Sequence, residues 1–87
     1  MTKRIAVLGS TGSIGKSTMD VVRNLGPERA VVTALAAKSN IDLLEQQARE
    51  FRPELIAVYD ENQAIELQRR LPEFTILAGI EGVNTVA

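Results

Sequence analysis

The sequence contains no cysteine and no histidine among its 87 residues. These absences exclude disulfides, cysteine and histidine nucleophiles, histidine general bases and zinc sites of the usual kind. A chain without cysteine also fits a reducing compartment, and we expect a cytoplasmic protein.

An excess of charge of one sign is also missing, because ten Lys and Arg residues face eleven Asp and Glu residues and the net charge is -1. This balance gives no electrostatic reason to expect binding to nucleic acid or to an anionic membrane. No run is long and apolar enough to span a bilayer, and residues 1–4 do not lead into the apolar core of a signal peptide. We therefore expect neither a nucleic-acid partner nor a membrane partner.

Hydrophobic residues make up 45% of the sequence, which is typical of a globular domain. A length of 87 residues is enough for one small domain. It is too short for a dinucleotide-binding half and a substrate-binding half together.

Three glycines at regular intervals stand in the segment Gly-Ser-Thr-Gly-Ser-Ile-Gly, residues 9–15. The four apolar residues 5–8 precede it and predict a buried strand, and helical spacing over residues 13–25 follows it. Glycine lets a phosphate approach the main chain closely, and the N–H groups at the start of a helix hold the anion. A strand, a glycine-rich turn and a helix in this order are typical of the first unit of a nucleotide-binding α/β fold.

Strands and helices are predicted to alternate along the chain. Apolar segments predict strands at residues 5–8, 30–37, 55–59 and 74–78. Helical spacing and caps predict helices at residues 13–25, from Ser39 or Asn40 to 51 and from Asp60 to 71, with a turn and a further helix after 79. The predicted fold class is α/β, a Rossmann-like parallel sheet with helices on both faces and about four strands. Because a Rossmann domain normally has six strands, residues 1–87 are interpreted as the N-terminal part of such a domain.

Each helix is expected to bury one apolar face. The expected inward residues are Ile14, Thr18, Val21, Val22 and Leu25, then Ile41, Leu44, Ala48 and Phe51, then Ala64, Leu67 and Leu71. Since residues 5–8 are all apolar, we expect that strand to be buried on both faces. The aromatic residues Phe51, Tyr59 and Phe74 are interpreted as core residues rather than as a stacking surface.

A second interpretation of the glycine segment is the P-loop of an ATP or GTP hydrolase. Gly15-Lys16-Ser17 matches the end of that motif, and Asp60 after an apolar strand resembles a magnesium-binding aspartate. The motif needs glycine where this sequence has Ser10, so the phosphate cradle would differ in geometry. A helix cap is the alternative role of Asp60, and a tight turn without a ligand is the alternative role of the glycines.

The end of the second predicted strand bears on the choice between NADH and NADPH. NAD-dependent enzymes place a carboxylate about 20 residues after the glycine loop, where it binds the ribose 2′-hydroxyl. This sequence has Lys38, Ser39 and Asn40 there, which supply a positive charge and hydrogen-bond donors. A charge-assisted hydrogen bond contributes ~1.5–3 kcal/mol, which favours NADPH roughly ten-fold or more. A solvated lysine and ordinary helix caps are the alternative roles of these residues.

With these residues in view, the sequence resembles the N-terminal NADPH-binding domain of the 1-deoxy-D-xylulose 5-phosphate reductoisomerase family. The segments that carry the resemblance are residues 8–15, 17–18 and 20–23, Ala34 to Ala37 with Asn40, and Glu50-Phe51-Arg52-Pro53. Many members read Gly-Lys-Asn where this chain reads Lys38-Ser39-Asn40. Which of Lys38 and Ser39 contacts the 2′-phosphate therefore stays open.

The resemblance implies an oxidoreductase that rearranges 1-deoxy-D-xylulose 5-phosphate and reduces the intermediate to 2-C-methyl-D-erythritol 4-phosphate, in non-mevalonate isoprenoid biosynthesis. It implies NADPH and magnesium or manganese as cofactors, a sugar-phosphate substrate and a cytoplasmic homodimer. The cofactor-binding residues that it implies are Thr11, Gly12, Ser13 and Ile14 near the pyrophosphate and Lys38, Ser39 and Asn40 near the 2′-phosphate. Catalytic and metal-binding residues are expected beyond residue 87, so this piece alone is expected to be inactive.

Three other functions stay open at this point. One is another NADP-dependent oxidoreductase, of the semialdehyde dehydrogenase type, which needs a catalytic cysteine further along the chain. The second is the P-loop hydrolase, whose Mg-nucleotide binding would collapse in Lys16→Ala. The third is a nucleotide-sensing module without catalytic activity.

Overall fold

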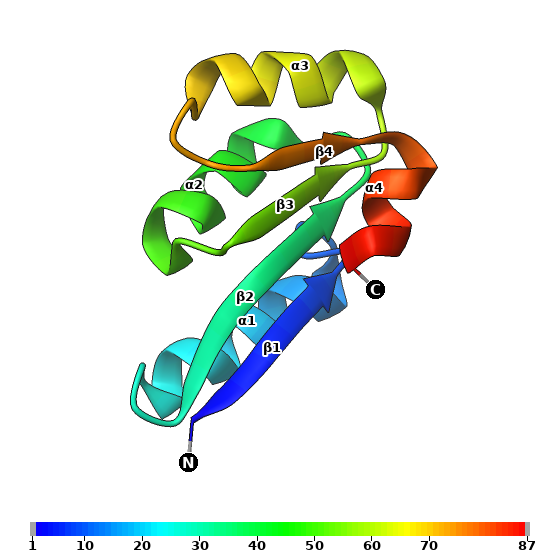
Figure 1. Ribbon diagram of the computed structural model, residues 1–87. Coiled ribbons are helices and arrows are strands. Elements are labelled where there is room, and N and C mark those ends of the chain that lie inside the picture. Colours follow the sequence, from blue (N-terminus) through cyan, green and yellow to red (C-terminus); the bar gives the residue numbers. More distant parts are fainter. Residues whose placement is uncertain (1, 87) are drawn as a thin grey trace.

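The computed structural model describes residues 2–86, which form a four-stranded parallel sheet with helices on both faces (Figure 1). The strands are β1 (Lys3–Leu8), β2 (Ala30–Ala37), β3 (Leu55–Val58) and β4 (Ile76–Ala78). The helices are α1 (Ser13–Leu25), α2 (Ile41–Phe51), α3 (Glu61–Arg70) and α4 (Gly79–Val86). The predicted α/β fold is confirmed, although β1 begins at Lys3 rather than Ile5 and β4 at Ile76 rather than Phe74.

The order of strands in the sheet is β1-β2-β3-β4, so each crossover moves one strand further in the same direction. Crossovers of one hand that all move the same way place their helices on the same face. Accordingly α1, α2 and α3 share one apolar core with that face, and Met19, Leu44 and Leu67 are among its fully buried side chains. The smaller cluster Ala34, Ala36 and Ala57 belongs to the other face, where α4 lies near the carboxyl ends of the strands (Figure 1).

Two of the helices begin at the capping residues that the sequence provides. The side chain of Asn40 accepts a hydrogen bond from the Leu43 N–H at the start of α2. At the start of α3, the side chain of Asp60 accepts one from the Gln63 N–H at 3.0 Å. Such caps contribute about 1 kcal/mol each and fix where a helix starts.

The buried face of α1 differs from the expected one. Val22 is buried as expected and Thr18 is half-buried, but Ile14, Val21 and Leu25 are exposed. The buried residues of this helix are Gly15, Met19 and Val22. The physical reason is the close passage of α1 over the preceding turn at Gly15, which only glycine permits and which sets the rotation of the helix. An apolar stripe is therefore left on the outside of α1.

The expectation that β1 is buried on both faces is also wrong. Val7 is buried, whereas Ala6 and Leu8 on the opposite face are exposed. The strand lies at an edge of the sheet, and α4 packs mainly against β3 and β4 rather than over β1.

Tyr59 is the third departure from the expected core. Phe74 is buried and Phe51 is half-buried, in agreement with a core role. Tyr59, by contrast, is 51% exposed, because it follows the last residue of β3 where the chain leaves the sheet. The core interpretation therefore fails for this residue alone among the three aromatics.

Candidate functional site

The glycine segment forms the turn that leads from β1 into α1, and two of its glycines are required by the fold itself. Gly9 has a φ of 66°, in the left-handed region that side chains rarely adopt. Gly15 is buried, and a Cβ there would lie 2.1 Å from the carbonyl oxygen of Gly9 and 2.6 Å from Cα of Ser10. The first glycine therefore makes the turn, and the third lets the helix pass directly over it.

The fold gives no such reason for Gly12. Its φ of -81° is open to any residue, and a Cβ would meet only the Gly9 carbonyl oxygen, at the ordinary contact distance of 3.4 Å. The residue is exposed and faces a cavity. Because Gly12 has no side chain, a phosphate in that cavity could approach the main chain closely, as nucleotide binding at such a turn requires.

The start of α1 differs from the starts of α2 and α3. Gly12 occupies its N-cap without a side-chain hydrogen bond, and no acidic residue lies in the first turn. The first N–H groups of a helix have no acceptor within the helix and carry the positive end of its dipole. This helix start is thus suited to an anion at the glycine turn.

The turn is also held from β2 and α2. Ser10 is completely buried, and its N–H donates to the carbonyl oxygen of Ala36 at 3.0 Å. The side-chain amide of Gln47, which is itself buried, donates from Nε2 to the carbonyl oxygen of Ser10 at 2.7 Å. The sequence offers no signal for this contact, because the two residues are 37 positions apart.

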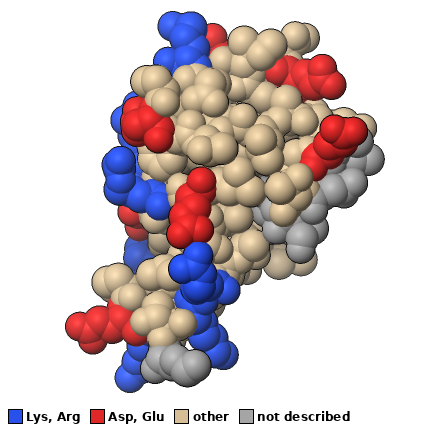
Figure 2. Space-filling view, viewed as in Figure 1, with Lys and Arg blue, Asp and Glu red and all other residues tan. Residues whose placement is uncertain are grey.

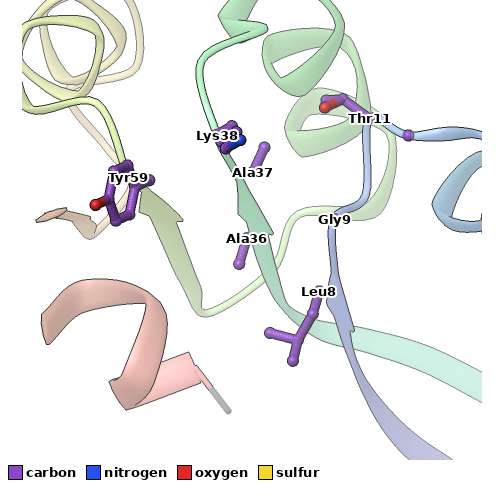
Figure 3. A pocket seen from close by; sticks show the side chains of 8 residues that line it. Leu8, Gly9, Thr11, Ala36, Ala37, Lys38 and Tyr59 are labelled. Atoms are coloured by element: carbon purple, nitrogen blue, oxygen red, sulfur yellow. The ribbon is translucent and has the colours of Figure 1, made fainter. Parts of the chain in front are cut away.

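A cavity of about 370 Å³ opens at the carboxyl ends of β1, β2 and β3 (Figure 3). Its walls are residues 8–12 except Ser10, the end of β2 with Lys38, and Tyr59 after β3. The volume is within the range of small-molecule sites. The position agrees with the rule that open parallel sheets bind ligands beyond the carboxyl ends of their strands.

The residues predicted near the pyrophosphate divide into two groups. Thr11 and Gly12 line the cavity. Ser13 and Ile14 are the first two residues of α1 and do not line it, and the Ile14 side chain is 84% exposed. The groups that these two residues can offer an anion are their backbone N–H groups at the helix start and, for Ser13, the side-chain hydroxyl.

The residues predicted near the 2′-phosphate divide in the same way. Lys38 lines the cavity, whereas Ser39 and Asn40 are exposed residues outside its lining. Asn40 already uses its side-chain oxygen to cap α2. The geometry thus favours Lys38 over Ser39 as the group that faces a ligand.

The residues of the P-loop interpretation lie elsewhere. Lys16 lines a groove between α1 and α2, together with Asp20 and Glu50, and not the cavity at the glycine turn. Asp60 caps α3. Since a P-loop needs its lysine on the phosphates, this arrangement does not support a P-loop.

Charged side chains lie mostly outside this cavity and pair with one another. Arg23 bridges Asp20 and Glu50, and Arg70 bridges acidic residues of α2 and α3. Hydrogen bonds from Arg69 and Arg70 lower the pKa of Glu66 to about 2. In Figure 2, Lys and Arg lie at the top, along the left side and at the bottom, Asp and Glu lie on both the left and the right, and most of the centre of this face is uncharged.

Within residues 2–86, no group of three or more His, Cys, Asp or Glu side chains is placed to hold a metal ion. None of the helices in that range combines the length and the apolar character needed to cross a membrane.

A parallel α/β sheet whose first strand leads through a glycine turn into an uncapped helix, with a cavity at that turn, defines a nucleotide-binding domain of the Rossmann type. The family profile described as 1-deoxy-D-xylulose 5-phosphate reductoisomerase matches residues 5–87. The chain belongs to this family. The resemblance drawn from the sequence is thereby confirmed.

Individual relatives agree with this membership. The chain is 58% identical to the 1-deoxy-D-xylulose 5-phosphate reductoisomerase of Protochlamydia amoebophila over 98% of its own length, and 52% identical to that of Acetivibrio thermocellus over 100%. It spans only 22% and 23% of these two relatives.

Solved structures give the same result. The reductoisomerase from Zymomonas mobilis in complex with NADPH matches 99% of this chain with a TM-score of 0.89 and 30% identity, and 23% of that chain is covered. A DOX-P reductoisomerase in complex with NADPH, fosmidomycin and magnesium matches 92% of this chain with a TM-score of 0.84 and 34% identity, and 20% of that chain is covered. These relatives favour the reductoisomerase over the semialdehyde dehydrogenase type, the P-loop hydrolase and the nucleotide-sensing module.

Proposed function

We propose that this chain is the N-terminal part of the NADPH-binding domain of an enzyme that converts 1-deoxy-D-xylulose 5-phosphate to 2-C-methyl-D-erythritol 4-phosphate in non-mevalonate isoprenoid biosynthesis. Family membership supports this reaction, and the relative from Zymomonas mobilis was solved with NADPH. NADPH supplies the hydride of the reductive step. The chain matches about a fifth of the length of its relatives, and the cavity at its glycine turn supports cofactor binding as the contribution of this part.

The observation that carries this proposal is the unexplained glycine of the turn. Gly9 and Gly15 are glycines because the fold needs them, but Gly12 has an ordinary φ and room for a Cβ. It lines the cavity and is itself the N-cap of α1, the place where the pyrophosphate of a dinucleotide approaches the main chain. Close approach of a bound pyrophosphate explains why residue 12 is glycine, which the fold of the chain without a ligand does not explain.

Lys38 supports NADPH rather than NADH as the dinucleotide. It stands at the end of β2 and lines the same cavity as Gly12. A lysine there offers charge to the 2′-phosphate, and the sequence places no carboxylate at residues 36–40 that would bind a ribose 2′-hydroxyl.

The edge of β1, which pairs with no second strand among residues 2–86, and the exposed stripe Ile14, Val21 and Leu25 on α1 support a longer protein whose domain continues beyond these elements. We place the substrate site and a magnesium or manganese site in that continuation, which the related complex with fosmidomycin and magnesium supports. A cytoplasmic location agrees with the lack of cysteine, and the homodimer rests on the family resemblance alone.

The test is a comparison of NADPH binding by Gly12→Val and by the unchanged chain in calorimetric titrations. The expected result is loss of binding in Gly12→Val with an unchanged circular dichroism spectrum, since the valine fills the phosphate approach and not the core. Asn24→Val, on the exposed far end of α1, serves as the control and is expected to bind as the unchanged chain does. Equal affinity of all three chains would contradict the proposal.

A further inference from the structure

Tyr59 is an aromatic side chain that the core does not use. It is 51% exposed and lines the cavity at the glycine turn. It is also the chain's single tyrosine, and the chain has no tryptophan. Among the residues that the structure describes, no other aromatic residue lines this cavity.

The three parts of the cavity lining that could contact a ligand follow three neighbouring strands. The glycine turn follows β1, Lys38 follows β2 and Tyr59 follows β3, and these strands are adjacent in the sheet. Figure 3 shows the same order, with Lys38 between Thr11 and Tyr59. Parallel strands are spaced by about 4.8 Å, so the turn and Tyr59 are separated by roughly 10 Å at the strand ends.

The adenylate half of NADPH presents its groups in the matching order, from the pyrophosphate through the ribose with its 2′-phosphate to the adenine ring. A pyrophosphate on the glycine turn and a 2′-phosphate at Lys38 leave the next position, at Tyr59, for the base. An adenine ring needs a flat apolar surface more than a charge, and a tyrosine ring provides one.

We propose that Tyr59 is the stacking platform for the adenine ring of the cofactor, a role that rests on the NADPH-binding function proposed above. The backbone on which the ring is mounted is fixed, because the Tyr59 N–H donates to the Ala37 carbonyl at 3.0 Å and the Asp60 N–H donates to the Lys38 carbonyl at 2.9 Å. These bonds join the ends of β2 and β3 and do not involve the side chain. Substitution of the ring therefore removes the platform and leaves the strand ends in place.

The absence of tryptophan makes the tyrosine emission of the 87-residue chain a direct report on this one ring. The probe is 2′,5′-ADP, which carries the adenine, the ribose and both phosphates but no nicotinamide. We expect it to quench the emission with the same saturation point that calorimetry gives, after correction for absorbance with free tyrosine amide. Nicotinamide mononucleotide, which lacks adenine, is expected to leave the emission unchanged.

Three variants distinguish the contribution of the aromatic ring to NADPH affinity from the contributions of the hydroxyl and of side-chain volume. Tyr59→Phe is expected to bind NADPH as the unchanged chain does, whereas Tyr59→Leu and Tyr59→Ala are expected to bind at least about five-fold more weakly. Since the side chain is half exposed, all three are expected to keep the unfolding midpoint within a few degrees.

The outcomes distinguish this proposal from the function on which it rests. If NADPH binds and Gly12→Val abolishes binding, but Tyr59→Ala keeps full affinity and 2′,5′-ADP leaves the emission unchanged, the stacking role is wrong and the cofactor site stands. Quenching by nicotinamide mononucleotide instead of 2′,5′-ADP would also overturn it, by placing the other base at Tyr59. Failure of the folded chain to bind any of these nucleotides would overturn both.

Discussion

The side chain of Gln47 and the backbone of Ser10 join α2 to the glycine turn by a buried hydrogen bond of 2.7 Å from Nε2 to the carbonyl oxygen. Ser10 belongs to the turn that carries the candidate phosphate site, so this amide fixes the site from outside the glycine motif. The Oε1 atom of Gln47 and the Oγ atom of Ser10 are buried there without a hydrogen-bond partner among the described residues. Loss of the hydrogen bond from Gln47 to Ser10 is expected to lower the stability of the fold, because leaving a buried polar group without a hydrogen-bond partner costs about 1–3 kcal/mol.

We expect Gln47→Leu to lower the free energy of unfolding by about 1–3 kcal/mol, because the Ser10 carbonyl loses its donor in a buried place. We also expect weaker NADPH binding at a temperature where the variant is fully folded, since the turn loses one of its two supports. Urea denaturation and calorimetric titration measure the two effects. Gln46→Leu, at the exposed neighbouring position, is the control; a loss of stability without any change in affinity would limit Gln47 to a structural role.

The second and third glycines of the motif are expected to differ in how much a substitution by alanine destabilises the fold. Gly15→Ala forces a Cβ to within 2.1 Å of backbone, so part of the turn or α1 must move, and we expect a loss of more than about 2 kcal/mol. Gly12→Ala meets only an ordinary contact and changes stability by less than about 1 kcal/mol. Urea denaturation of both variants measures the difference, and equal destabilisation would contradict the separate roles assigned to the two glycines.

Selectivity for the 2′-phosphate is expected to depend on Lys38. Lys38→Gln removes the charge that faces the cavity, and we expect roughly ten-fold weaker binding of NADPH with little change for NADH. Ser39→Ala is the matched control from the next position and is expected to change neither. Ser39→Asp, which brings a carboxylate close by, is expected to weaken NADPH more than NADH. Equal losses for the two dinucleotides would argue against a 2′-phosphate contact at this end of β2.

The ion pairs of α3 predict a weak dependence of stability on acid. Hydrogen bonds from Arg69 and Arg70 lower the pKa of Glu66 in the folded chain from 4.5 to about 2. The stabilisation is therefore present above the ordinary pKa and is lost as the pH falls from about 4.5 toward 2. Urea denaturation across this range is expected to show a smaller drop for Glu66→Gln than for the unchanged chain. The difference is expected to shrink in high salt, since both ion pairs of Glu66 are partly exposed to solvent; an identical pH dependence in both chains would show that Glu66 contributes nothing.

Every strand and helix could be predicted from the sequence, but the predicted buried face of α1 was wrong. This helix has apolar residues on two sides, and hydrophobicity alone predicts that the side with Ile14, Val21 and Leu25 is buried. The decision comes from the backbone contact between Gly15 and the turn, which turns Met19 and Val22 toward the sheet. The third glycine of the motif was the available signal, because a glycine needed for close packing must lie on the buried side.

The remaining differences arise from contacts between distant parts of the chain. The exposure of Leu8 and Tyr59 depends on which strand lies at the edge and where α4 packs, neither of which local spacing encodes. The Gln47–Ser10 hydrogen bond joins two segments whose proximity exists only after β2 and α2 have folded back. Thr11, Gly12 and Lys38 were predicted from motif and position, and the fold brings them to one cavity.

Parallel calorimetric titrations of the 87-residue chain with NADPH, NADH and Mg-ATP, with circular dichroism to verify the fold, show whether the glycine turn is a site for NADPH. We expect NADPH to bind about ten-fold or more tightly than NADH, because Lys38 and the glycine turn face one cavity. Little or no binding is expected for Mg-ATP, since Lys16 lies in the groove between α1 and α2. A preference for Mg-ATP, or no binding of NADPH by the folded chain, would contradict an NADPH site at the glycine turn.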